Sequence, residues 1–166
     1  MTYIVATRKP TNFPALASRD SDDDAWPIGL VTRQCLAAAT LLIGDSVYIN
    51  SAGKAAKSAT ATDYKTCIGV VVGGASFSPV GETSFVSANN GQTAATADQM
   101  VIIATIGSVV YAVAANAVVL GTRVGIGAVS GRVDDAATVN LFGVALGTAS
   151  ANGDALKIYL GGISTA

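Results

Sequence analysis

The 166-residue sequence contains no histidine, and this absence removes much of ordinary enzyme chemistry. Histidine is the most common general base, the usual activator of a serine or cysteine nucleophile, and a frequent ligand of transition metals. The two cysteines, Cys35 and Cys67, lie in apolar runs without a neighbouring charge that would lower a thiol pKa. We interpret them as small buried residues, with a disulfide or reactive thiols as the alternative. We expect no enzymatic activity, no catalytic residues, no cofactor and no metal.

Charge is also scarce. Charged residues make up 13% of the chain, whereas about 25% is usual, and 51% of the residues are hydrophobic. This balance suits a protein that buries much of its surface against copies of itself or a partner, or a membrane protein. Ten basic and eleven acidic residues form no basic stripe, so we expect no nucleic-acid partner.

One uncharged stretch, from Met100 to Thr122, is long enough to suggest a membrane span. Its glycines, its Asn116 and its many β-branched residues favour strands instead, so no membrane partner is expected. The first ten residues lack the basic and apolar regions of a secretory signal. We expect a protein made in the cytoplasm, and either used there or assembled there and released.

The organising feature of the chain is an internal repeat. An apolar pair leads into Gly, a polar pair and two alternating apolar residues; a Gly followed by a basic residue comes next, and then an apolar strand that contains Gly and Val. The equivalent segments are 42–49 and 119–126, then 53–54 and 131–132, then 68–73 and 142–147. Such self-similarity indicates one supersecondary unit used twice.

Short strand-like segments separated by Gly-rich turns predict an all-β fold. We expect a small β-barrel or sandwich built from the internal two-fold repeat, with a closed barrel favoured because closure removes open sheet edges. The duplicated barrel would occupy residues 33–166, with unit one at about 34–108 and unit two at about 109–166. Residues 1–32 lie outside the repeat and predict an extended N-terminal arm, because prolines interrupt them.

The arm carries an acidic cluster at 20–24 and the only tryptophan, Trp26. Alternate carboxylates partly match a calcium loop, but the central Gly and the distal Glu are missing, so a solvated or partner-binding acidic turn is favoured.

Three further features concern the two units. Residues 74–98 have no counterpart in unit two and predict an insertion, which in repeat proteins often lies on a binding face. The glycine pairs Gly73–Gly74 and Gly161–Gly162 open no helix and are interpreted as turns. Asp134 and Asp135 are interpreted as solvated surface.

The run Gly-Asp-x-Val-x-Ile … Gly-Lys … Ile-Gly-Val-x-x-Gly resembles the capsid cement, or head decoration, proteins of tailed bacteriophages. The matching residues are Gly44, Asp45, Val47, Ile49, Gly53, Lys54, Ile68, Gly69 and Val70. Unit two departs from this run, because Thr122 replaces the Asp and Arg132 replaces the Lys.

The resemblance implies a structural protein made in the host cytoplasm that binds the outer capsid surface of the virion and clamps neighbouring capsomers. Its implied partners are the major capsid protein and two further copies in a homotrimer, with the N-terminal arm lying on the shell. The candidate contact residues of the arm are Tyr3, Ile4, Arg8, Phe13, Arg19, Trp26 and Ile28.

Two other functions stay open. A carbohydrate- or host-binding β-module displayed on a surface would need aromatic side chains grouped on one loop face, which only the segment from Phe77 to Phe85 offers. A small hydrolase would need a carboxylate pair assembled from distant loops.

Overall fold

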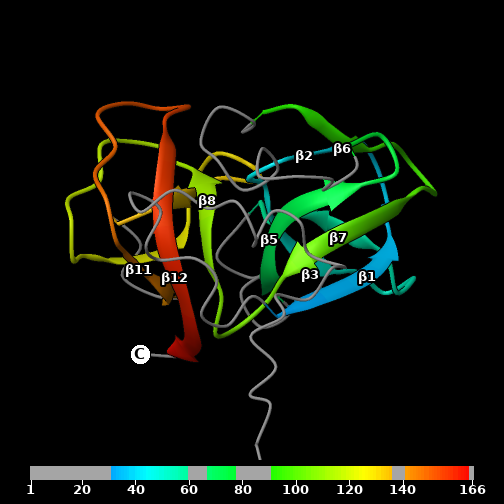
Figure 1. Cartoon of the computed structure of the whole chain (residues 1–166), viewed down its shortest axis with the longest axis horizontal. Helices are drawn as coiled ribbons and strands as arrows, with labels where there is room; N and C mark the ends of the chain where they lie inside the picture. Colours follow the sequence, from blue (N-terminus) through cyan, green and yellow to red (C-terminus); the bar gives the residue numbers. More distant parts are fainter. Residues whose placement is uncertain (1–30, 60–66, 78–90, 136–140, 165–166) are drawn as a thin grey trace, which may run out of the picture.

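The computed structural model describes residues 31–59, 67–77, 91–135 and 141–164, and these residues form an all-β fold, as the sequence predicts. No helix occurs among them. Residues 31–108 and 109–164, here called unit one and unit two, each form a five-stranded sheet (Figure 1). Unit one contains β1 (Thr32–Leu36), β2 (Leu41–Leu42), β3 (Ser46–Ile49), β4 (Ala55–Lys57), β5 (Cys67–Gly74), β6 (Thr93–Ala95) and β7 (Met100–Ala104). Unit two contains β8 (Val109–Val113), β9 (Arg123–Ile126), β10 (Val133–Asp134), β11 (Leu141–Ala145) and β12 (Ala155–Ser164).

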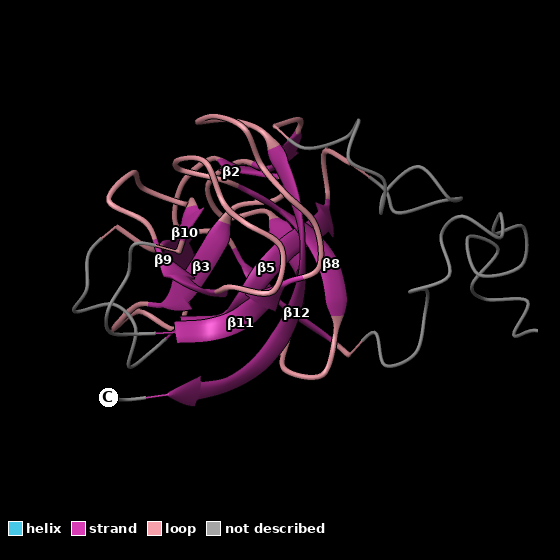
Figure 2. Ribbon diagram, turned by 90° about the vertical axis from the view of Figure 1, so that its left-hand side faces the viewer, coloured by secondary structure: helices cyan, strands magenta, loops and turns pink. Residues whose placement is uncertain are grey.

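The two sheets have the same strand order. Unit one is ordered β1-β7-β5-β3-β4 and unit two β8-β12-β11-β9-β10, with every neighbouring pair antiparallel. The strands β2 and β6 pair separately in unit one, and a single bridge between Val118 and Ala149 takes their place in unit two. In Figure 1 the sheet of unit two lies on the left and that of unit one on the right; Figure 2 shows how strongly β12 curves.

The correspondence extends to irregularities of the sheets. The register of β5 on β3 shifts next to Gly69, and the register of β11 on β9 shifts next to Gly143. Each glycine lies against the backbone of the last strand: a Cβ would lie 1.8 Å from the carbonyl oxygen of Ala104 at Gly69, and 2.6 Å from that of Tyr159 at Gly143. No larger residue fits at either position, which explains why both copies of the repeat have Gly before Val.

Turn hydrogen bonds repeat as well. The N–H of Gly44 donates to the carbonyl of Val71, and the N–H of Gly121 donates to that of Ala145, both at 2.9 Å. Both glycines have positive φ, 90° and 82°, a conformation that a residue with a Cβ adopts only at a cost. The Gly-polar step of the repeat is therefore a left-handed turn that starts the second strand of each sheet.

Two buried clusters form the core. One belongs to unit one and includes Leu41, Val47, Val71, Val101 and Ile103. The other consists of unit-two residues together with Val70, Val72 and Ala104 of unit one. Along β5, successive side chains thus enter different clusters, because neighbours on a strand point to opposite faces. One face of the unit-one sheet packs on unit two.

Two expectations are wrong in detail. The strand ladder of each sheet does not close, with β1 and β4, or β8 and β10, at its edges. Single parallel bridges, between Ala37 and Ala55 and between Ala114 and Val133, join these edges at one end, so each unit is barrel-like without being a fully closed barrel. The glycine pairs Gly73–Gly74 and Gly161–Gly162 lie inside β5 and β12 rather than in turns. Gly74 is required there because a Cβ would lie 2.4 Å from the carbonyl oxygen of Ala94.

The uncharged stretch 100–122 forms β7 and β8 with the turn between them. In the part of the chain that the structure describes, no helix has the length and apolar character needed to cross a membrane.

Candidate functional site

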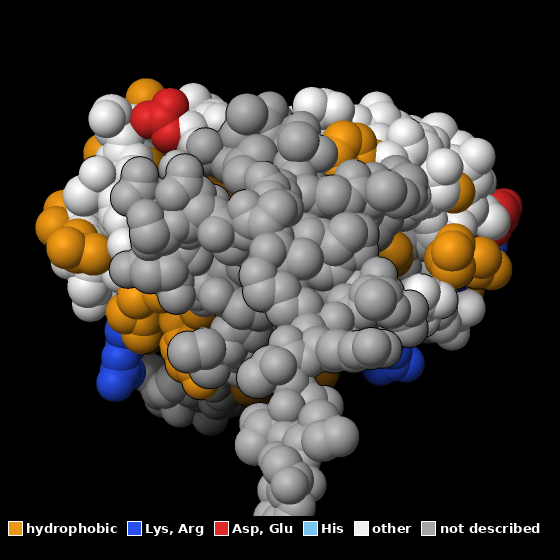
Figure 3. Space-filling view, in the orientation of Figure 1, with side chains coloured by type: hydrophobic (Ala, Val, Ile, Leu, Met, Phe, Trp, Pro, Cys, Tyr) orange, Lys and Arg blue, Asp and Glu red, His pale blue; other side chains and the backbone are white. Residues whose placement is uncertain are grey.

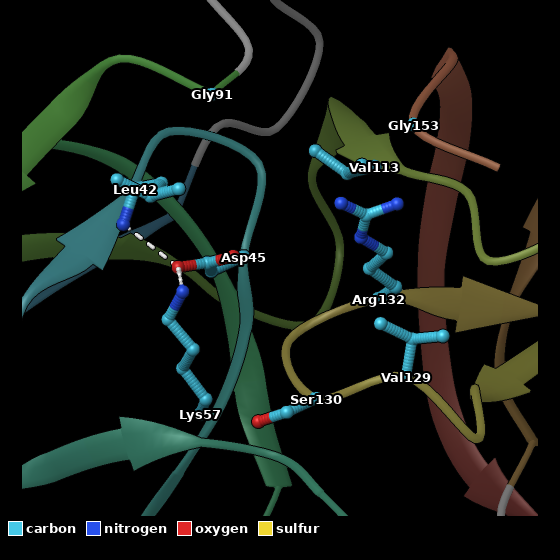
Figure 4. Close-up of a pocket in the computed structure, with 9 residues that line it drawn as sticks. All are labelled: Leu42, Asp45, Lys57, Gly91, Val113, Val129, Ser130, Arg132 and Gly153. Atoms are coloured by element: carbon cyan, nitrogen blue, oxygen red, sulfur yellow. Dashed lines mark hydrogen bonds and ion pairs between the residues drawn. The ribbon is translucent and has the colours of Figure 1, made fainter.

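A cavity lined by described residues lies where the two units meet. Its volume is about 180 Å³. Strand ends and turns of both units line it (Figure 4): Leu42, Asp45, Lys57, Gly91, Val113, Val129, Ser130, Arg132 and Gly153.

Asp45 is the acidic residue of the Gly-Asp step and is the buried charge of this cavity, with its side chain 6% exposed. Its Oδ2 accepts a hydrogen bond of 2.7 Å from the N–H of Leu42 and lies 3.0 Å from Nζ of Lys57. Figure 4 shows both contacts as dashed lines. The carboxylate thus closes the turn before β3 and ties it to β4.

Burial raises the pKa of the Asp45 carboxyl above its ordinary value. The hydrogen bond from Leu42 and the interactions with Lys57 and Arg132 oppose this increase without cancelling it. Desolvation therefore outweighs the ion pair, which is common for a buried pair.

Gly131 of unit two lies against this carboxylate. Its N–H donates to the carbonyl of Ser58 and its carbonyl accepts from the N–H of Ser46, both at 2.7 Å. A Cβ on Gly131 would lie 2.7 Å from Oδ1 of Asp45. The Gly-Arg turn of unit two is therefore inserted into the Asp45 turn of unit one.

Lys54 follows Gly53 in unit one, and Arg132 follows Gly131 in unit two. These two basic residues have the same role in their units. Arg132 hydrogen-bonds the side chain of Asn152, and Lys54 forms an ion pair with Asp98. Asn152 and Asp98 belong to the loops that precede the last strands, β12 and β7. Each basic residue therefore holds a hairpin turn onto the loop that leads into the final strand of its own unit.

The cavity's chemistry favours a structural role. Asp45 binds Lys57 and the N–H of Leu42, and Arg132 binds Asn152. The main charged groups of the cavity therefore bind other protein atoms. Within the described residues, no group of three His, Cys, Asp or Glu side chains lies close enough together to hold a metal ion. The arrangement fixes the position of one unit on the other.

The other residues singled out from the sequence fall into three classes. The arm residues Tyr3, Ile4, Arg8, Phe13, Arg19, Trp26 and Ile28, and the acidic cluster 20–24, lie outside the described residues. Cys35 is half-buried and packs beside the unit-one core, and burial raises the pKa of its thiol. Phe77 also packs against that core, whereas Phe85 lies outside the described residues.

Asp134 corrects an expectation. It is 5% exposed and accepts a 2.7 Å hydrogen bond from the side-chain amide of Asn116, so it is not a solvated surface residue. Pairing of β10 with β9 brings the carboxylate inside, where the amide stabilises it. Asp135 next to it is half-buried.

Asp45 and Lys57 show what the sequence could reveal. Asp45 belongs to the motif noted above, but its partner Lys57 belongs to no pattern. The sequence offers one signal for this pair: both residues differ between the two copies of the repeat. Thr122 and Asp135 hold the equivalent positions in unit two.

No protein-family model matches the chain, and no curated protein matches it either.

Proposed function

We propose that the protein is a structural virion component that binds the outside of an icosahedral phage capsid and cements neighbouring capsomers. The observation that carries this proposal is the Gly-Asp-x-Val … Gly-Lys … Gly-Val run, which resembles the corresponding run of capsid decoration proteins. In unit one these residues form β3, the turn before β4, and β5. The run thus belongs to the structural frame of the sheet.

The surface of the described residues supports adhesion. Large apolar side chains are exposed on it, as the orange groups at both ends of the molecule in Figure 3 illustrate: Val31, Leu36, Met100, Ile106, Val119, Leu120, Val129, Leu146 and Tyr159. Exposed apolar area of this kind is typical of interaction sites. The charged groups of the junction cavity are held by other protein atoms, Asp45 by Lys57 and Arg132 by Asn152, and therefore suit a mechanical role better than a catalytic one.

In this proposal the duplicated sheets form a rigid cap, and the arm supplies the contact with the major capsid protein. Phe13 and Trp26 would be the main anchors, because aromatic side chains dominate interface energies. The cap is a homotrimer on the outer surface of the virion. Binding of this kind stabilises only the assembled shell, by about 2.7 kcal/mol per site at a free concentration one hundred times Kd.

Removal of residues 1–30 tests the proposal. The truncated protein and the full chain are each mixed with purified phage shells stripped of their own decoration protein, and sedimentation measures the bound fraction. We expect the full chain to pellet with the shells and the truncated chain to stay in the supernatant. Circular dichroism and thermal melting of the truncated chain provide the control for folding.

A matched pair of variants refines this experiment. Trp26→Ala with Phe13→Ala should weaken shell binding at least tenfold, whereas Asp22→Asn with Asp23→Asn should change it much less if aromatic anchors carry the contact. Full decoration by the truncated chain would contradict the proposal. Specific binding on a glycan array, without binding to shells, would favour a carbohydrate-binding module instead.

A further inference from the structure

The two units contact each other through different surfaces. Unit one contributes its front face, defined as Gly44, Ser46, Val70, Val72 and Ala104. Unit two contributes its rear face, defined as β8 with Val113 and the turn at Gly131. The N–H of Val113 donates to the carbonyl of Gly44 at 3.1 Å, and the N–H of Ser46 donates to that of Gly131 at 2.7 Å. The contact is therefore head-to-tail, and each unit leaves its other face outside the junction.

The front face of unit one is buried by this contact. Val70 and Ala104 are 0% exposed and Val72 is 3% exposed, and all three belong to the cluster formed by unit two. Burial of valine side chains stabilises a fold because it removes apolar area from water. The junction therefore has a substantial apolar centre.

The front face of unit two lies outside the junction and is partly exposed: Val144 is half-buried, and its neighbours are more open. Val144 and Tyr159 form a cross-strand pair that corresponds to Val70 and Ala104. Tyr159 is 41% exposed, and so is Leu146, which follows Ala145 as Val72 follows Val71. An equivalent surface is thus dry in one unit and solvated in the other, and the exposed copy carries the larger apolar side chains.

The rear faces differ in the opposite way. Val113 of unit two is 7% exposed, whereas the equivalent residue of unit one, Leu36, is 47% exposed. Gly131 lies against Asp45 and Lys57, whereas Gly53 at the equivalent turn has no atom within 4 Å of the place where a Cβ would be. Unit one thus has a free rear face, and unit two a free front face.

We propose that these two free faces bind each other in different copies of the chain, so that the contact between copies repeats the junction within each copy. The rear face of unit one, with Leu36 and Gly53, docks on the front face of unit two, with Val144, Leu146 and Tyr159. The matching backbone bonds run from the N–H of Leu36 to the carbonyl of Gly121, and from the N–H of Arg123 to the carbonyl of Gly53. This contact is independent of shell binding.

The charges at the free faces are complementary. Within the chain, Arg132 enters a cavity that already holds Lys57, and Asp45 lies between the two cations. At the contact between copies, Lys54 replaces Arg132, Asp135 replaces Lys57, and the neutral Thr122 replaces Asp45. Arg123 also replaces Ser46, so two cations and one carboxylate meet there, the same combination as at the junction within the chain. Lys54 remains within reach of Asp98 of its own unit, with which it forms an ion pair.

A head-to-tail contact between identical chains either closes into a ring or continues as a filament. A ring of three chains would place six units in head-to-tail succession, alternating between units one and two. The free apolar faces of every copy would then be covered, and no exposed face would remain to recruit further copies.

Two charged variants test the contact. Leu36→Glu places a carboxylate on the free rear face, and Tyr159→Glu places one on the free front face. Sedimentation velocity measures the mass of each variant and of the wild-type chain. We expect an oligomer for the wild type and a 16.5 kDa monomer for each variant. Ile106→Glu, at an exposed position of the turn between β7 and β8, is the matched control and should keep the wild-type mass.

Mixing the two variants gives the sharper result. Each variant retains one intact face, and the intact faces are complementary, so an equimolar mixture should form complexes of two chains and nothing larger. The double variant, with both changes in one chain, should stay monomeric alone and in the mixture. Circular dichroism spectra that match the wild type show that each variant is folded.

Three results would overturn the proposal. The first is a wild-type chain that stays monomeric at the highest soluble concentration, as expected if residues 1–30 of the same chain cover both faces. The second is an oligomer that persists in both single variants. The third is a mixture of folded variants that stays entirely monomeric, since this would mean that the two faces do not bind each other.

Discussion

At the scale of single residues, two glycines in equivalent turns have different constraints. Gly53 and Gly131 both have positive φ, 74° and 78°. Only Gly131 has protein atoms against it, because its turn is inserted into the Asp45 turn of unit one. Comparison of the two positions therefore separates the cost of backbone conformation from the cost of contact between the units.

Alanine at each glycine measures these costs. Gly53→Ala should lower the free energy of unfolding by about 1–2 kcal/mol, the cost of a left-handed residue with a Cβ. Gly131→Ala should lower it by about 1–3 kcal/mol more, because the new methyl group overlaps Oδ1 of Asp45. Urea unfolding measures both. Equal losses of unfolding free energy in the two variants would mean that the turn of unit two is not in close contact with Asp45.

The Asp45 carboxyl predicts a pH dependence. Because burial raises its pKa above the ordinary value of 3.8, the folded state binds this proton more tightly than the unfolded state. Its contribution to stability is therefore greatest below pH 3.8 and is lost as the pH rises through the raised pKa. Asp45→Asn removes the titration and keeps an oxygen that can accept from Leu42.

We expect the melting temperature of the wild type, minus that of Asp45→Asn, to be larger at about pH 4 than at pH 7. Thermal melts of both proteins at the two pH values measure this difference. Asp98→Asn, at an exposed carboxyl that does not line the junction cavity, is the control for the general effect of removing a negative charge. A difference that shrinks on acidification would contradict the prediction.

Residue roles could be predicted where backbone geometry alone requires them. Gly44 and Gly69 belong to the repeat because a turn and a close strand contact exclude any Cβ. The sequence does not predict the burial of Asp134 or the pairing of Lys57 with Asp45, because their partners come from other elements of the fold. A polar residue shows its partner only after the sheet has formed.

At the scale of elements, the strand β5 separates two cores. Val71 packs within unit one, and Val70 packs against unit two. The corresponding strand β11 has Ala145 in the core and Val144 on the half-buried front face. The side chain at this position is therefore fully buried in unit one and only half-buried in unit two.

Aspartate at the equivalent positions tests this difference. Val70→Asp should lower the free energy of unfolding by about 3–5 kcal/mol, because it leaves an unpaired charge buried between the units. Val144→Asp should lower it by about 1 kcal/mol. Chemical unfolding of both variants at a concentration where the chain is monomeric provides the comparison. Similar losses would show that β5 and β11 are buried alike.

The strands themselves were predictable to a useful degree. Alternating apolar residues and Gly-rich turns indicated an all-β fold, and the repeat suggested one unit used twice. The incomplete closure of the sheets cannot be predicted, because alternation shows which side of a strand is buried but not how far the edge strands pair with each other. The sequence suggests turns at Gly73–Gly74 and Gly161–Gly162, whereas both pairs lie inside strands. Turns and close contacts between strands both require glycine, so the residue type alone does not distinguish them.

At the scale of the whole molecule, two contacts are proposed, and they use separate parts of the chain. Removal of residues 1–30 should abolish shell binding and leave the number of chains in the oligomer unchanged. Leu36→Glu should abolish the oligomer and leave the arm intact. The head-to-tail arrangement could not be predicted from the sequence, because the repeat relates the units to each other without showing which surfaces they share.

The short turn that joins the units has one more consequence. Only residues 105–108 separate β7 from β8, and Ser108 donates to the carbonyl of Thr105 across this turn. Such a tether keeps the two partners at a high effective concentration, so the contact inside each chain survives any dilution. Only the contact between chains obeys the law of mass action. In the proposed ring of three chains, three of the six contacts between units would lie inside a chain, so that the ring would assemble from a scarcer pool of protein.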